Sequence, residues 1–225
     1  MKKLFILLFF ACLTFLPQYT KAEGNGLYLA PKFLMSIQDT GSISRPGVVS
    51  GTGIDDYSQF TLGGALAIGY DFWIQQMIPI RLEVEFALRG NSEKTWDNKG
   101  RYFDEVKGLW NNSTLFANVF WDFHNETDFT PFVGGGLGMA FNYTGYTLTA
   151  NNGNKYTIDD TQTNFAWNLG AGVSYAVNET FNIDASYRFV DLGYNELKTH
   201  FNGRDYKTSN NPYNNEFMVG LRFNF

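Results

Sequence analysis

The chain has 225 residues, a formal net charge of −5, 18% aromatic residues and only 17% charged residues. The acidic balance and the lack of Lys/Arg clusters argue against nucleic-acid binding, and one cysteine excludes a disulfide framework. Many aromatics with 23 glycines instead favour β-strands that face something apolar. The length fits one domain.

The N-terminus has the features of a secretory signal peptide. Lys2 and Lys3 precede the apolar run Leu4–Leu16, and Thr20 and Ala22 place small residues where a signal peptidase cuts. We predict that residues 1–22 are removed after Ala22 and that residues 23–225 form one exported domain. The run is too short for a membrane helix, which needs about 20 apolar residues, so a membrane-bound mature chain would be a barrel.

In the first half of the mature chain, apolar and polar residues alternate with the period of a β-strand. The pattern predicts strands over Gly26–Ile37, Gln59–Phe72, Pro79–Arg89 and Leu109–Phe123. It is strictest in Pro79–Arg89, where one face is entirely apolar. Phe116 and Phe120 blur the alternation in the fourth strand.

Four more alternating segments follow, over Phe129–Tyr143, Asn164–Tyr175, Phe181–Phe189 and Glu216–Phe225. Long and short connections alternate between the eight predicted strands. The long ones are 38–58, 90–108, 144–162 and 193–212, and the short ones are 73–78, 124–128 and 178–180. This asymmetry is typical of outer-membrane barrels, which have short periplasmic turns and long outer loops.

The polar faces of several strands carry very small residues, such as Gly134, Gly136 and Gly138. Glycine weakens a strand unless something must approach closely, and the centre of an eight-stranded barrel has just enough room for the side chains of the other strands. The sequence therefore predicts an all-β, eight-stranded, antiparallel, transmembrane up-and-down β-barrel. A soluble sandwich and a lipocalin-like barrel are the alternatives.

Four segments carry a resemblance to a known family: Pro79–Phe86, Pro131–Gly138, Tyr187–Gly193 and the ending Phe217–Phe225. In these segments the chain resembles the opacity-protein-like outer-membrane β-barrels, relatives of the OmpA-type barrel. The resemblance implies a bacterial outer-membrane location and contact with outer-membrane lipid. It also implies that the terminal Phe225 is the aromatic residue recognised by the barrel-assembly machinery.

The sequence contains no constellation that points to catalysis. His124 lies in a predicted periplasmic turn and His200 in the last outer loop, so the only histidines fall at opposite ends of the barrel. Glycine runs such as Gly134–Gly138 lack the spacing and the following helix of a phosphate loop. We therefore expect no enzyme activity, no cofactor and no metal site.

Charged residues on the polar faces form the first candidate site. Five positive and six negative charges are expected inside the barrel, where unpaired charges are costly. Asp71 is one of the negative residues, and the others form a candidate lumen charge network: Lys32, Arg81, Glu83, Glu85, Arg89, Asp122, Asp184, Arg188, Glu216 and Arg222. We expect a salt-bridge network that fills the lumen; a charged selectivity filter is the alternative.

Aromatic residues of the long loops form the second candidate site, because aromatics are enriched where proteins bind proteins. They are Tyr57, Trp96, Tyr102, Phe103, Tyr146, Tyr156, Phe201 and Tyr206. In the families that the chain resembles, the exposed loops carry the function. We predict a surface protein that acts through its four outer loops on a host receptor or matrix protein and supports envelope integrity. A narrow porin for small solutes is the alternative function. For the aromatics themselves, the alternative is that they pack on each other or rest on the outer headgroups.

Overall fold

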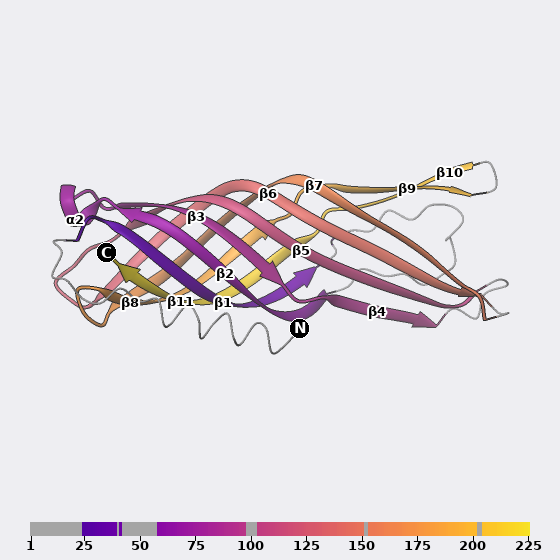
Figure 1. Cartoon of the computed structure of the whole chain (residues 1–225), viewed down its shortest axis with the longest axis horizontal. Helices are drawn as coiled ribbons and strands as arrows, with labels where there is room; N and C mark the ends of the chain where they lie inside the picture. Colours follow the sequence, from indigo (N-terminus) through magenta and orange to yellow (C-terminus); the bar gives the residue numbers. More distant parts are fainter. Residues whose placement is uncertain (1–23, 40, 42–57, 98–102, 151–152, 202–203) are drawn as a thin grey trace.

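The described part of the chain forms a closed antiparallel β-barrel, which confirms the predicted fold class (Figure 1). The computed structural model describes residues 24–39, 41, 58–97, 103–150, 153–201 and 204–225. The predicted signal peptide, residues 1–22, lies outside these residues. No helix among the residues described is long and apolar enough to cross a membrane.

Eight strands form the barrel wall. The sheet order is β3-β2-β1-β11-β8-β7-β6-β5-β4, and an additional pairing of β3 with β5 closes the barrel. The elements are β1 (Leu27–Asp39), β2 (Ser58–Asp71), α2 (Trp73–Gln76), β3 (Ile80–Arg89), β4 (Ser92–Asp97), β5 (Phe103–Asp122), β6 (Phe129–Ala150), β7 (Lys155–Ala176), β8 (Phe181–Asp191), β9 (Asn195–Phe201), β10 (Arg204–Asn210) and β11 (Tyr213–Asn224).

At one end the strands continue beyond the barrel wall. β4 extends the line of β3 after Gly90 and Asn91, because both strands pair with β5. β9 and β10 form a separate hairpin between β8 and β11. Figure 1 shows β4, β9, β10 and the far ends of β5, β6 and β7 projecting from the same end, which we call the extended end. The opposite end is the short-turn end.

The prediction of long loops at the extended end is partly wrong. Much of 90–108, 144–162 and 193–212 is β-strand, and β5, β6 and β7 reach 20, 22 and 22 residues. Polar residues such as Thr147 and Thr157 face each other across the β6–β7 hairpin. The apolar signal fades where no lipid contacts the strand, but the backbone pairing continues, and this is why the alternation underestimated strand length.

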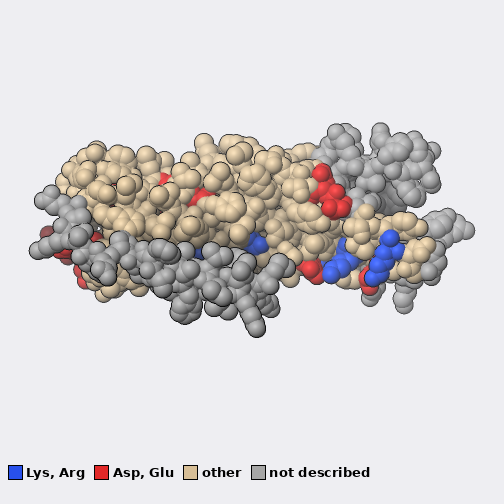
Figure 2. Space-filling model, in the orientation of Figure 1, with Lys and Arg blue, Asp and Glu red and all other residues tan. Residues whose placement is uncertain are grey.

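The outer wall is apolar, as expected for strands that face lipid. Val84 is 52% exposed and Leu137 is 61% exposed, whereas the charged residues next to Val84 are buried. Figure 2 shows this side of the barrel wall with few charged side chains, which gather instead toward the extended end. This inversion of a soluble core is typical of a transmembrane barrel.

Short polar turns and α2 close the short-turn end. Asn125 and Asn178 each accept a backbone hydrogen bond from the threonine two residues later, which fixes the β5–β6 and β7–β8 turns. The chain ends meet here: Asn25 donates to the Phe225 carbonyl at 2.7 Å, and Phe225 donates to Leu27 at 2.9 Å. Phe225 itself is 40% exposed on the outer wall.

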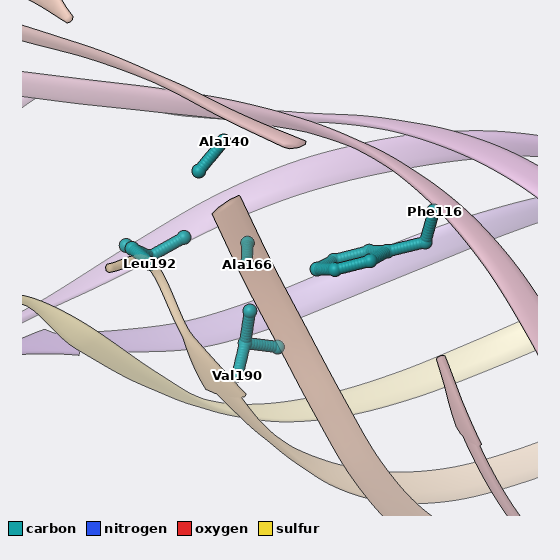
Figure 3. Packing of buried hydrophobic residues seen from close by; sticks show 5 residues of the cluster. All are labelled: Phe116, Ala140, Ala166, Val190 and Leu192. Carbon is teal, nitrogen blue, oxygen red and sulfur yellow. The ribbon is translucent and has the colours of Figure 1, made fainter. Parts of the chain in front are cut away.

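Inside the barrel, large and small residues complement each other. In Figure 3 the ring of Phe116 points toward Ala166 and Val190, beside Ala140 and Leu192. Gly138 on β6 has no room for a side chain, because a Cβ there would overlap the Leu115 carbonyl of β5. The glycines on the lumen face therefore permit close approach of the neighbouring strand and its long side chains.

Candidate functional site: lumen and extended end

A continuous chain of ion pairs crosses the lumen in the part nearer the extended end. The Lys32 Nζ lies 2.5 Å from Glu83 Oε1 and 2.7 Å from Glu85 Oε2. Arg188 then joins Glu85, at 2.6 Å, to Glu216, at 2.8 Å. Arg89 completes the chain by pairing with Glu216. Four strands, β1, β3, β8 and β11, are thus tied together through the barrel centre.

A second set of ion pairs lies nearer the short-turn end. Arg81 and Asp122 form a bidentate ion pair, in which Nε donates to Oδ2 at 2.6 Å and Nη2 donates to Oδ1 at 2.9 Å. Asp184 lies 3.8 Å from Arg81 and 3.5 Å from Arg222, and Arg222 lies 3.5 Å from Asp71. The structure thus places every residue of the candidate charge network in the lumen and in an ion pair.

Aromatic rings pack against the cations of the lumen, and the sequence did not identify this role. The Arg81 guanidinium lies 5.1 Å from the Phe120 ring centroid and 4.9 Å from that of Phe132. Arg188 lies 5.7 Å from the Phe116 centroid. Such contacts stabilise a cation in a dry site. Phe116 and Phe120 share the parity of the lumen residue Asp122, and this signal could have assigned them to the interior.

Neutral polar residues complete the network, and the alternating sequence pattern did not single them out. Tyr28 donates to Glu83 at 3.1 Å, Thr114 accepts from Arg89 at 3.1 Å, and Ser174 accepts from Arg222 at 2.7 Å. These bonds compensate buried carboxylates and guanidinium groups that have lost water. The charged side chains are therefore held in fixed positions by their neighbours.

An amide layer lies above the ion pairs, at the mouth of the barrel. Asn112 donates to Gln38 at 3.1 Å, and its side-chain amide lies 3.1 Å from that of Asn214. Gln38 also donates to Thr61 at 2.6 Å, and Asn142 donates to the Leu192 carbonyl at 3.0 Å. Moving outward along the lumen, the chemistry thus changes from charged groups to neutral amides.

The candidate loop aromatics are strand residues in several cases, which corrects the expectation that all lie in loops. Trp96, Phe103, Phe201 and Tyr206 belong to β4, β5, β9 and β10, where only the backbone is described. Tyr57 and Tyr102 lie outside the described residues.

Two of these aromatics have described side chains. Tyr156 on β7 is 53% exposed. Tyr146 on β6 is half-buried edge-on against Trp110, with the ring centroids 5.7 Å apart. Burial raises the pKa of Tyr146 to about 12, so its hydroxyl stays protonated at neutral pH. Tyr156 is therefore the clearest contact candidate and Tyr146 part of a packed wall.

The histidines lie at separate places. His124 follows β5 at the short-turn end, with its ring 3.8 Å from that of Trp73, and His200 lies in β9 opposite Asp205. Within the described ranges, no group of three or more His, Cys, Asp or Glu residues is arranged to hold a metal ion.

Comparison with known proteins gives concordant results. The family model of the outer membrane protein beta-barrel domain matches residues 5–225. Outer membrane protein PagN of Salmonella typhimurium strain LT2 is 30% identical over 221 residues, covering 92% of each chain.

Two solved structures share the fold. Neisserial surface protein A aligns with a TM-score of 0.50 and 17% identity, covering 90% of this chain and 99% of its own. OprG from Pseudomonas aeruginosa aligns with a TM-score of 0.50 and 16% identity, covering 89% and 97%. The structures and the family match indicate the same architecture.

Proposed function

Because this chain belongs to the outer membrane protein beta-barrel domain family, we propose that it is a surface-interaction protein whose extended end faces the cell exterior. The chain is a bacterial outer-membrane β-barrel protein. On this proposal residues 1–22 direct export, Phe225 is recognised by the barrel-assembly machinery, and the barrel anchors a contact surface for a host receptor or matrix protein while supporting envelope integrity.

The observation that carries the proposal is the contrast between a filled lumen and strands that are longer than a membrane requires. A membrane β-strand needs about 9–11 residues, whereas β6 and β7 have 22 each. About half of each strand therefore lies outside the bilayer. A barrel that only spans the membrane would not need these residues, since a hairpin can close with two to five residues.

The filled lumen weighs against the narrow-porin alternative. Glu85, Arg188 and Glu216 meet at the barrel centre and are at most 5% exposed at their side chains. An ion that crosses the lumen would have to separate these ion pairs. Breaking a buried ion pair is costly, because each group loses its partner without gaining solvent. We therefore assign the lumen a structural role and the extended end the interaction role.

The test compares the intact protein with a shortened barrel. Short turns replace residues 40–57, 93–109, 144–160 and 192–212, so that each cut follows a cross-strand pair: Asp39 with Ser58, Ser92 with Trp110, Tyr143 with Thr161, and Asp191 with Tyr213. Cells with equal amounts of each barrel in the outer membrane are assayed for adhesion to host cells and matrix. The purified proteins are assayed for conductance in planar bilayers.

We expect the shortened barrel to assemble, to lose adhesion and, like the intact protein, to show no stepwise conductance. Four variants that each carry one replacement then identify the hairpin responsible. Adhesion that persists in the shortened barrel contradicts the proposal. Stepwise conductance of the intact protein would establish the porin alternative instead.

A further inference from the structure

A small cavity lies at the mouth of the barrel, just above the ion pairs. It has a volume of about 30 Å³, and its lining includes the amide side chains of Gln38, Asn112, Asn142 and Asn214. A space of this size holds about two water-sized groups. The cavity can therefore take the terminal hydroxyl groups of a ligand, with the rest of the ligand above it.

The amide floor is held in place from below. The side-chain amides of Asn112 and Asn214 lie 3.1 Å apart, and the Asn214 amide also lies 3.3 Å from the Glu216 carboxylate. Gln38 is fixed by Thr61 and by the Gly90 carbonyl at 3.1 Å. A floor that is already ordered costs little entropy when a ligand binds, which favours recognition.

An aromatic wall rises above this floor. Trp110 lines the cavity and contacts Tyr146 on the next strand. Further out, the lumen-side alternation of β6 and β7 continues with the cross-strand pair Leu148 and Tyr156. We give the name mouth cup to the cavity residues Gln38, Asn112, Asn142, Asn214 and Trp110, together with Tyr146, which packs on Trp110, and Tyr156, which lies further out on the lumen-side face of β7.

The charges of the mouth cup give no preference for an ionic ligand. Asp39 is the only charged residue among the described residues that line the cavity, and its carboxylate accepts bonds from the Gly41 amide, at 2.7 Å, and from the Ser58 hydroxyl. The charges below the floor are paired with each other. Lys94 on β4 and Asp160 on β7 lie further toward the extended end. They carry opposite charges, so together they favour neither an anion nor a cation.

We propose that the mouth cup binds the terminus of a neutral saccharide, an inference that rests on the outward orientation of the extended end in the proposed function. Each sugar hydroxyl both donates and accepts a hydrogen bond, and each amide side chain offers both partners. The C–H faces of a sugar ring carry partial positive charge and pack against the negative faces of aromatic rings. A saccharide can therefore hydrogen-bond to the amide floor and pack against the aromatic wall at the same time.

Binding is measured with the full-length protein in nanodiscs, using immobilised neutral oligosaccharides that end in hexose or N-acetylhexosamine, with sulfated and sialylated oligosaccharides and unglycosylated peptides alongside. Trp110→Leu and Asn112→Leu remove one wall ring and one floor amide. Tyr156→Ala removes an exposed wall ring, and Thr157→Ala, at the next residue on the opposite face, is its matched control. Heat-dependent gel migration shows that each variant is folded.

We expect saturable binding of at least one neutral oligosaccharide, weakened about tenfold in Trp110→Leu and Asn112→Leu. Tyr156→Ala should weaken it severalfold, and Thr157→Ala should leave it unchanged. Where Trp110→Leu fails to fold, the Tyr156 and Thr157 pair decides the question. The inference is overturned if no neutral oligosaccharide binds, if acidic oligosaccharides or peptides bind instead, or if the Tyr156 and Thr157 variants behave alike.

Host cells treated with glycosidases separate this inference from the proposed function. If adhesion depends on the hairpins but survives glycosidase treatment, the saccharide inference is overturned, whereas the proposed function stands with a protein as the partner. Loss of adhesion after removal of neutral terminal sugars supports the saccharide. Adhesion by the shortened barrel contradicts the proposed function itself.

Discussion

Glu216 shows at the residue scale how the lumen accommodates charge. Its carboxylate is fully buried and is shared by Arg89 and Arg188, with Ser36 donating a further hydrogen bond at 3.3 Å. A buried ion pair need not add net stability over an apolar pair. Removing one member alone, however, leaves its partners charged and without solvent.

Substituting Glu216→Gln should therefore destabilise the folded barrel by about 3–5 kcal/mol, because two buried arginines lose their shared anion. Urea unfolding in lipid vesicles measures the difference. Lys107→Ala is the matched control, since it breaks the exposed Lys107–Glu93 pair at 2.8 Å, and should cost at most about 1 kcal/mol. Equal effects of the two substitutions would refute the role assigned to the buried network.

At the same scale, Val84 tests the lipid face. It lies in the middle of β3, points outward and is 52% exposed. Arginine at this position should reduce barrel stability by about 2–4 kcal/mol. The control Thr157→Arg lies on the projecting part of β7 and should have little effect. Tolerance of Val84→Arg in the same unfolding assay would show that β3 does not face lipid.

At the scale of elements, the β5–β6 pair depends on the glycines of β6. Phe120 faces Gly134, Asn118 faces Gly136 and Phe116 faces Gly138 across the two strands. The large partners therefore occupy the space that side chains on β6 would take. The side chains of β5 thus fill the part of the lumen that lies over both β5 and β6.

We expect Gly138→Ala to destabilise the barrel by about 1–3 kcal/mol, because the new methyl group meets the Leu115 backbone and one strand must shift. Gly64→Ala is the control on the outer wall. A Cβ there would lie 3.6 Å from the Lys32 carbonyl, which is an ordinary contact. Unfolding midpoints should separate the two variants, and a tolerated Gly138→Ala would argue against tight β5–β6 packing.

At the scale of the whole molecule, closure of the barrel leaves every wall strand paired on both sides within the bilayer. β3 meets β5, and β1 meets β11 along ten residue pairs. Backbone groups in hydrocarbon must be satisfied within the protein, and a closed barrel achieves this. Cooperative resistance to detergent follows from the same closure.

The unboiled protein should therefore migrate faster on a detergent gel than the boiled protein, because the closed barrel stays compact until heat opens it. It should also fractionate with the outer membrane. Membrane fractionation and gels of heated and unheated samples measure both properties. Recovery as a soluble periplasmic protein, with the same migration before and after boiling, would contradict the assignment.

The sequence was sufficient for the barrel because period-two alternation states directly which residues face lipid. It placed Arg81, Glu85 and Arg188 on the lumen side for the same reason, and the structure brings them into ion pairs. It could not state which acid pairs with which base, because partners such as Arg89 and Glu216 are 127 residues apart and meet only through barrel closure.

The extended end was harder to predict, because the contrast between apolar and polar residues disappears when water contacts both faces of a strand. Thr147 and Thr157 pair across β6 and β7 although neither is apolar. The mouth cup was not predicted for a related reason: Gln38, Asn112 and Asn214 belong to three strands that are far apart in the sequence. Nothing in their local sequence indicates that they meet.

The pairing of β1 with β11 also has a kinetic consequence. β1 is the first barrel strand to be exported, but it cannot pair with β11 until the last strand is also exported. Lys32, for example, pairs with Gly220. Contacts so distant in sequence form slowly, and during the delay both edges of the sheet are open to pairing with other chains. The nascent protein must therefore cross the periplasm with its edges protected, so holding chaperones there should limit its yield more than barrel stability does.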